Sequence, residues 1–198
     1  MSESAPETAP QPLTEPVRRG RRMAPYISLA VAVVVAALFV VLATGKAEKP
    51  DVVSSFLIGK PAPAVATTTI DGKPFDLSRR KGSWVVLNFF QSSCLPCKAE
   101  HPALVSFAAQ QSGITDGAEL YTVVWDDSVA NVSSYFADHG GAWPVIKDDN
   151  GSIATAFGVA KVPETWIIDP SGTIVGRYIA ITADGLSTDL EGFRQAYG

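Results

Sequence analysis

The sequence predicts an α/β fold in which a mixed sheet carries helices on both faces. Segments of strand character alternate with helical segments from residue 84 to residue 157, and this alternation is typical of α/β domains. The run at 84–90 is almost continuously apolar, as expected of a central strand that is covered on both sides. Two strands separated by the turn at 169–172 then precede a last helix, which adds an antiparallel pair to the sheet.

The other elements follow from local patterns. A hairpin is expected from strands at 65–70 and 73–77, because Asp71 and Gly72 form a turn signal between them. The polar residues at 79–82 are expected to form a solvated loop. The remaining expected helices are 94–111, 128–139, a short helix ending at 157, and 186–197, and the remaining strands are 119–125, 144–147, 165–168 and 173–179.

The N-terminal part has a different composition. Residues 1–17 are rich in Pro, Ala, Glu, Ser and Thr without apolar periodicity, and we expect residues 1–22 to form a disordered cytoplasmic tail. Residues 23–45 contain no charged side chain and are long enough, as a helix, to cross a hydrocarbon core of roughly 30 Å. We therefore expect one transmembrane helix before the α/β domain. The arginines that precede this run outweigh Lys46 and Lys49 after it, which predicts a cytoplasmic N-terminus and an extracytoplasmic domain at the cell membrane.

A cleaved signal peptide is the alternative interpretation of the same segment. The apolar run is longer than a usual signal-peptide core, and residues 42–47 form a poor cleavage site, so an uncleaved anchor is favoured. Residues 46–58 are predicted to be a linker, and residues 59–198 a single globular domain. The chain has a net charge of −4 and no large basic patch, which argues against a nucleic-acid partner.

Both cysteines of the chain, Cys94 and Cys97, lie between the central strand and the following helix. A disulfide across two intervening residues removes little entropy from the unfolded chain, so a reactive pair is more plausible than a structural one. A helix N-terminus stabilises a thiolate and lowers the pKa of its cysteine. We expect Cys94 to be the exposed nucleophile and Cys97 the buried thiol that resolves a mixed disulfide. Ser92 or Ser93 is a candidate helix cap.

A metal site is the competing interpretation of these cysteines. Structural zinc usually takes four protein ligands, and the sequence offers no second Cys/His pair beside Cys94 and Cys97. His101 is expected on the surface of the helix, and His139 at the end of a later helix. We therefore predict neither a metal nor a cofactor.

Several motifs together resemble one family. They are the segments at 59–63, 71–77, 88–90, 148–151, 158–159, 162–165 and 168–172, together with the cysteine motif and Pro102. Over about residues 57–198 the chain resembles the TlpA/ResA-type membrane-anchored thiol–disulfide oxidoreductases, which include the CcmG/DsbE-like group. The resemblance implies a thioredoxin-like three-layer fold with an N-terminal hairpin and an extra inserted αβ segment.

The resemblance also implies site residues. Pro163 would have a cis peptide bond and face the cysteines, and Val162 would expose its backbone for pairing with an extended substrate segment. Leu95 and Pro96, between the cysteines, would contact the substrate as well. Glu164 occupies the family's acidic position, where a buried carboxylate would raise the thiol pKa and relay a proton.

Two positions affect the choice of acid and of client. Asn88 stands where thioredoxin has an aspartate, as it does in the family that the chain resembles, which makes Glu164 the better candidate acid. Ser93 stands where the family usually has a tryptophan before the first cysteine, which leaves the choice of client open.

The function implied by the resemblance is reduction of disulfides in exported, cysteine-containing clients such as apocytochrome c. A membrane electron donor of the CcdA/DsbD type would recharge the protein at the lipid bilayer. Three alternatives remain: a disulfide-forming oxidant, a copper-binding chaperone on the same fold, and a peroxidase with antioxidant activity. The copper proteins have a wider cysteine spacing, and a peroxidase would need Thr or Ser at the position of Gln91.

Overall fold

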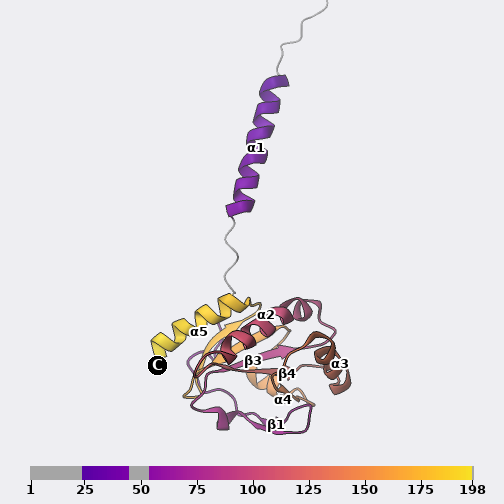
Figure 1. Cartoon of the computed structure of the whole chain (residues 1–198), viewed down its shortest axis with the longest axis vertical. Coiled ribbons are helices and arrows are strands. Elements are labelled where there is room, and N and C mark those ends of the chain that lie inside the picture. The colour runs from indigo at the N-terminus through magenta and orange to yellow at the C-terminus, as the bar shows by residue number, and fades with distance from the viewer. Residues whose placement is uncertain (1–23, 45–53, 198) are drawn as a thin grey trace, which may run out of the picture. The chain divides into compact units, whose positions relative to one another are not determined.

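The structure, a computed structural model, describes residues 24–44 and 54–197. The chain divides into two compact units, Met1–Ala47 and Glu48–Gly198, and each is described by itself. In the first unit, helix α1 spans Ala24–Thr44 (Figure 1). Counting only residues whose placement the structure describes, no helix has the length and apolar character needed to cross a membrane. The predicted tail at 1–22 and most of the predicted linker at 46–58 lie outside the described residues.

The second unit is built on a mixed five-stranded sheet with the strand order β5-β4-β3-β6-β7. Strands β3, β4 and β5 run parallel to one another, whereas β6 is antiparallel to both β3 and β7. All six residues of the central strand β3 are buried, as the apolar run predicted. The strands are β3 (Val85–Phe90), β4 (Glu119–Val124), β5 (Val145–Ile146), β6 (Glu164–Ile168) and β7 (Ile174–Tyr178).

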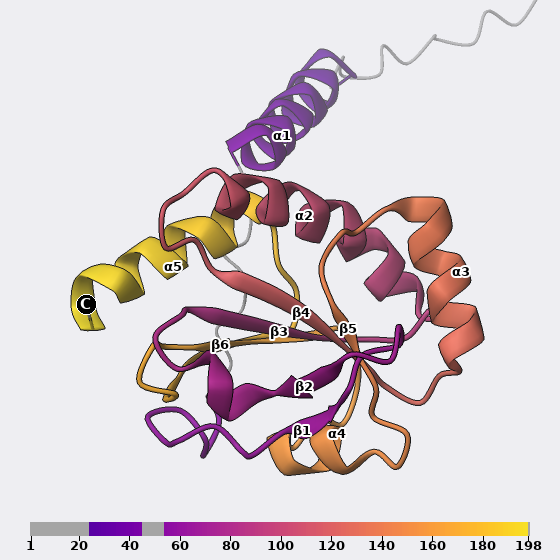
Figure 2. The same ribbon diagram turned by 60° about the horizontal axis from the view of Figure 1, so that its bottom comes forward.

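Helices cover both faces of this sheet, which makes three layers (Figure 2). One face carries α2 (Leu95–Ser112), α3 (Val129–His139) and α5 (Ala183–Tyr197). The other face carries the short helix α4 (Ser152–Phe157) and a separate antiparallel hairpin of β1 (Ala66–Thr68) and β2 (Pro74–Asp76). The predicted thioredoxin-like α/β fold and its N-terminal hairpin are therefore confirmed.

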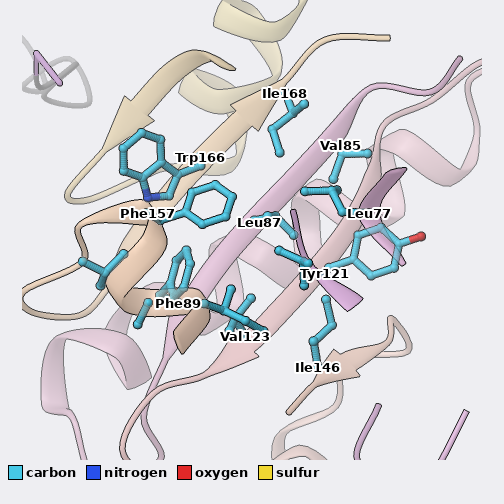
Figure 3. Packing of buried hydrophobic residues seen from close by; sticks show 14 of the residues in the cluster. Leu77, Val85, Leu87, Phe89, Tyr121, Val123, Ile146, Phe157, Trp166 and Ile168 are labelled. Carbon is cyan, nitrogen blue, oxygen red and sulfur yellow. The ribbon is translucent and has the colours of Figure 1, made fainter. Parts of the chain in front are cut away.

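Side chains alternate between the two faces along each strand, as strand geometry requires. Val85, Leu87 and Phe89 of β3 pack with Trp166 of β6 in the cluster beneath the hairpin and α4 (Figure 3). Val86 of β3 belongs instead to the cluster beneath α2 and α5. This alternation decides which polar side chains of β3 and β6 meet α2 and which point away from it.

Two segments differ from expectation. The residues at 79–82 were expected to be a loop, but a 3-10 helix at Leu77–Arg80 occupies the start of this segment. Asp76 caps this helix, because its carboxylate accepts a hydrogen bond from the Ser78 N–H at 2.9 Å. Leu57, inside the predicted linker, packs against the core of the domain.

Candidate active site

The site forms where the end of β3 meets the start of β6. These strands are antiparallel, and their pairing ends with Phe89 opposite Glu164. Val162 and Pro163, which precede Glu164, therefore lie beside the loop that leads from β3 to the cysteines. The Val162–Pro163 bond is cis, as the family resemblance implied, and Cys94 Sγ lies 3.5 Å from the Val162 carbonyl oxygen.

Cys94 and Cys97 form a disulfide at the start of α2, with their Cα atoms 5.2 Å apart. Cys94 itself is the N-cap of α2, and its Sγ accepts a hydrogen bond from the Cys97 N–H at 3.2 Å. The expectation that Ser92 or Ser93 would cap the helix is therefore wrong. The helix begins one residue too late for Ser93 and two residues too late for Ser92, whose N–H donates to Asp127 instead.

The two sulfurs differ in exposure. Cys97 is 1% exposed and packs with Phe90 and Tyr135, whereas Cys94 is only partly buried. Leu95, between the cysteines, is 77% exposed, and Pro96 is exposed as well. This arrangement suits attack by Cys94 on an incoming protein, with Cys97 protected from it.

A groove adjoins the site on the side of Ser93. It has a volume of about 960 Å³ and lies between the loop after β4 and the turn before α4. Its lining includes Trp125 and four aspartates but no lysine or arginine; the aspartates are Asp126, Asp127, Asp148 and Asp149. Two of these carboxylates already accept backbone hydrogen bonds: Asp127 from Ser92 and Ser128, and Asp148 from the first turn of α4.

Glu164, the predicted acid, is 1% exposed at the start of β6. Arg177 of β7 binds it with two hydrogen bonds, from Nε to Oε1 at 2.9 Å and from Nη2 to Oε2 at 2.8 Å. The hydrogen bonds from Arg177 satisfy both carboxylate oxygens. By the alternation along β6, Glu164 lies on the sheet face of Trp166, whereas α2 and Cys97 lie on the opposite face. Its proposed proton relay stays a prediction.

A second buried carboxylate was missed by the sequence reasoning. Glu100 is 8% exposed on α2, one helical turn after Cys97. Its Oε1 accepts from Asn88 Nδ2 at 2.9 Å, and its Oε2 accepts from the Ile181 N–H at 3.1 Å. Burial raises the pKa of Glu100 to about 7, although these two hydrogen bonds act to lower it.

The signal that could have identified Glu100 was its spacing. Residues three apart on a helix share one face, so burial of Cys97 implied burial of Glu100. Asn88 on β3 faces the same helix, and its Nδ2 also donates to Thr165 Oγ1 at 3.0 Å. The aspartate expected by analogy with thioredoxin is absent, but a carboxylate from the helix lies against the asparagine that replaces it.

The predicted surface position of His101 is wrong. The side chain is 2% exposed and lies in a cluster of aromatic rings formed by Phe90, Tyr135, Phe136 and Trp143. Its position one turn after Cys97 puts it on the buried face of α2, and its Nε2 lies 2.9 Å from the Gly140 carbonyl oxygen. Burial lowers the pKa of His101 and so favours the neutral ring, whose Nε2–H donates to that carbonyl.

Within the part of the chain that the structure describes, no three His, Cys, Asp or Glu side chains are grouped so as to hold a metal ion. The chemistry that the site does provide is exchange between a dithiol and a disulfide. An accessible sulfur lies at a helix N-terminus, a protected sulfur lies one turn away, and a backbone carbonyl lies beside the first.

Comparisons with known proteins agree with this chemistry. Residues 58–177 match the AhpC/TSA family. The chain is 34% identical over 134 residues to a thiol:disulfide interchange protein DsbE homolog of Paracoccus denitrificans, covering 66% of this chain and 71% of that protein. It is 31% identical over 117 residues to the thiol-disulfide oxidoreductase ResA of Bacillus subtilis, covering 59% of this chain and 64% of ResA.

A solved structure shows the same fold. The thiol:disulfide interchange protein, a thioredoxin family protein, from Chlorobium tepidum has a TM-score of 0.61 to this chain at 24% identity. The match covers 70% of this chain and 97% of that chain.

Proposed function

We propose, from the premise that this chain belongs to the AhpC/TSA family and is a thiol–disulfide oxidoreductase of the DsbE/ResA type, that it reduces disulfides in exported proteins. The observation that carries the proposal is the Cys94–Cys97 pair at the start of α2, beside the Val162 carbonyl. The DsbE homolog and ResA are named for interchange or oxidoreduction of thiols and disulfides, which supports thiol–disulfide exchange as the chemistry of this chain.

In the proposed cycle the Cys94 thiolate attacks one sulfur of a client disulfide. A mixed disulfide forms, and the other client sulfur leaves as a thiolate that takes up a proton. The Cys97 thiolate then attacks Cys94, restores the Cys94–Cys97 disulfide and releases the second client sulfur, which is also protonated. Two electrons and two protons pass to the client, and an external dithiol donor must return them to the protein.

Glu100 is the side chain best placed to hold a proton for the Cys97 step. It lies one turn after Cys97 on the buried side of α2, and its pKa of about 7 lets it gain or lose a proton near neutrality. Glu164 is the alternative acid, but its carboxylate is paired with Arg177. We therefore assign the proton exchange to Glu100.

We further propose that the segment at 23–45 anchors the protein in the cell membrane, with the oxidoreductase domain outside. The uncharged run at 23–45 and the arginines before it support this arrangement. A donor of the CcdA/DsbD type in the same membrane would return the electrons.

The anchor predicts that alkaline carbonate leaves the full chain in the membrane fraction and that protease added to spheroplasts digests the domain. Release by carbonate would show that the anchor is wrong.

For the client we propose cysteine-containing exported proteins such as apocytochrome c. An extended segment would pair with the Val162 backbone, contact Leu95 and Pro96, and continue into the groove beside Ser93.

The test is a trapping experiment with Cys97→Ala in the full chain. Without Cys97 the mixed disulfide at Cys94 cannot be resolved, so client proteins should accumulate on Cys94 and be identifiable by mass spectrometry. The double variant Cys94→Ala/Cys97→Ala is the matched control and should capture nothing. If the single and double variants give the same proteins, Cys94 is not the attacking sulfur.

A disulfide-forming oxidant is the second candidate, because the same Cys94–Cys97 pair can donate a disulfide as well as a dithiol. The redox state of the pair in cells separates the two. A mostly reduced pair supports the reductant, and a mostly oxidised pair supports the oxidant.

A further inference from the structure

The ion pair between Arg177 and Glu164 is the strongest polar contact beside the site that the proposed cycle does not use. Both guanidinium–carboxylate hydrogen bonds are shorter than 3.0 Å, and the side chains of Arg177 and Glu164 are 17% and 1% exposed. Two parallel bonds of this kind fix the orientation of both groups. The pair is therefore an ordered part of the fold and differs from a surface ion pair, which solvent would weaken.

The pair connects β7 to the segment that faces the disulfide. Arg177 lies opposite Trp166 in the register of β6 and β7, and its Cζ lies 5.3 Å from the centroid of the Trp166 ring. Glu164 is two residues beyond Val162, whose carbonyl oxygen lies 3.5 Å from Cys94 Sγ. By binding Glu164, Arg177 of β7 therefore holds in place the segment whose Val162 carbonyl contacts Cys94.

The charge of Glu164 also needs a partner. Glu164 lies two residues after the Val162 carbonyl that contacts Cys94. An ionised carboxylate there without a counterion would favour the neutral thiol, because two negative charges in a poorly solvated region repel each other. The Arg177 cation cancels that charge at a distance of 2.8 Å. Without it, Glu164 would either remain charged, and oppose the thiolate, or become protonated and lose both hydrogen bonds.

We propose that Arg177 is a positioning residue for disulfide exchange: it neutralises Glu164 and holds the Val162–Glu164 segment against Cys94, so that the Cys94 thiolate meets no unbalanced negative charge. This inference deepens the proposed function and rests on it, since it takes Cys94 as the attacking sulfur.

The other charged or titratable groups near the cysteines are left unchanged when only Arg177 or Glu164 is substituted. Glu100 and His101 are buried on α2, and the exposed Lys98 has its Nζ 5.9 Å from the Tyr135 ring centroid. Asp127 accepts from the Ser92 N–H on the loop before Cys94. None of these side chains hydrogen-bonds to Arg177 or Glu164 among the contacts described, so a change confined to that pair reports on the pair.

The experiment measures the titration of Cys94 in the reduced full chain, from the rate of its alkylation by iodoacetamide against pH. Arg177→Gln should leave Glu164 unbalanced and lower the thiolate fraction at pH 6 by about fivefold. Glu164→Gln should have the opposite effect, because the Arg177 cation then lacks its carboxylate. The double variant Glu164→Gln/Arg177→Gln should titrate as the wild type does, since no charge remains at either position.

Arg80→Gln is the matched control. Arg80 also pairs with a glutamate, at 3.6 Å from Glu119, but at the opposite ends of β3 and β4 from the cysteines, and its loss should leave the Cys94 titration unchanged. The proposal is overturned if Arg177→Gln titrates as the wild type does or if the double variant keeps the shift of Arg177→Gln. Should Arg177→Gln fail to fold, an unchanged titration in Glu164→Gln overturns it instead.

Failure of this inference is distinguishable from failure of the proposed function. The wild-type rate of exchange with a disulfide-bonded peptide is measured in the same series. If the wild type exchanges and the variants titrate alike, only the role of Arg177 is wrong. If Glu164 is a proton relay, Glu164→Gln and the double variant should lose the same fraction of the exchange rate, with no recovery in the double variant.

Discussion

The two buried glutamates beside the site, Glu100 and Glu164, lie on opposite faces of the same sheet and have opposite surroundings. Glu164 has a cation at 2.8 Å and accepts two charged hydrogen bonds. Glu100 has no cation among its described partners and accepts from one side-chain amide and one backbone N–H. Both are less than 10% exposed. The same side chain is therefore paired with a cation on one face and has a raised pKa on the other.

This difference shows that burial alone does not identify the titrating acid of a site. Desolvation favours the protonated form of any buried carboxyl, whereas a bidentate arginine favours the ionised form. The residue that the family resemblance pointed to is the one whose charge is already neutralised. The residue on the helix with the cysteines has the raised pKa of about 7.

The largest expected effect is on stability when the cation is removed. Arg177→Met should lower the free energy of unfolding by about 3–5 kcal/mol, because it leaves an uncompensated buried carboxylate. Urea denaturation at pH 7 measures it, with Arg80→Met as the control at a partly exposed pair, where less than about 1 kcal/mol is expected. Equal losses in the two variants would mean that the buried Arg177–Glu164 pair stabilises the fold no more than the partly exposed pair of Arg80 does.

The next effect is the pH dependence of stability due to Glu100. Between its ordinary pKa of 4.5 and its folded value of about 7, the folded chain binds the Glu100 proton more tightly than the unfolded chain does. Wild-type stability should therefore fall relative to Glu100→Gln by about 3 kcal/mol as the pH rises from 4.5 to 7. The difference between the two curves isolates Glu100, because other titrating groups such as His101 occur in both proteins.

Glu100→Gln is a suitable variant because Asn88 can adapt to it. Asn88 Oδ1 is buried without a hydrogen-bond partner among the described residues, so a turned amide can accept from the new glutamine Nε2. A parallel pH dependence in wild type and variant would contradict the raised pKa of Glu100.

The smallest effect concerns the hydroxyl that orients Asn88. Thr165→Val should lower the free energy of unfolding by about 1 kcal/mol, because the second Asn88 N–H loses its acceptor. Thr165→Ser keeps that acceptor and should lose less than the valine variant does, although it removes a methyl group. Urea denaturation compares the two, and a larger loss in the serine variant would show that packing matters more than the hydrogen bond.

Much of the fold could be predicted from local patterns. The apolar run of β3 and the turn at Asp71 and Gly72 each depend on residues close in sequence. The cysteine motif was equally local, since only two residues separate Cys94 from Cys97. These predictions needed no knowledge of how strands pair.

The rest depended on contacts between distant segments. His101 is buried because the rings of α3 pack against α2, which no pattern around residue 101 reveals. Glu164 was identified from its place after Pro163, but its partner Arg177 lies on the next strand, and only the register of β6 and β7 brings them together. Cys94 caps α2 instead of a serine because the helix starts later than expected.

The cap of α2 links the folding of the protein to its redox chemistry. Cys94 Sγ accepts the Cys97 N–H, and a negatively charged acceptor at a helix N-terminus is bound more strongly than a neutral one. The start of α2 is therefore most stable when Cys94 is a free thiolate and less stable when the Cys94 sulfur is part of a disulfide. By thermodynamic linkage, a helix that stabilises the reduced form makes the pair a weaker reductant. A stronger hydrogen bond to the Cys94 thiolate therefore raises the reduction potential of the Cys94–Cys97 pair. The stability of the first turn of α2 thus limits how strong a reductant this protein can be.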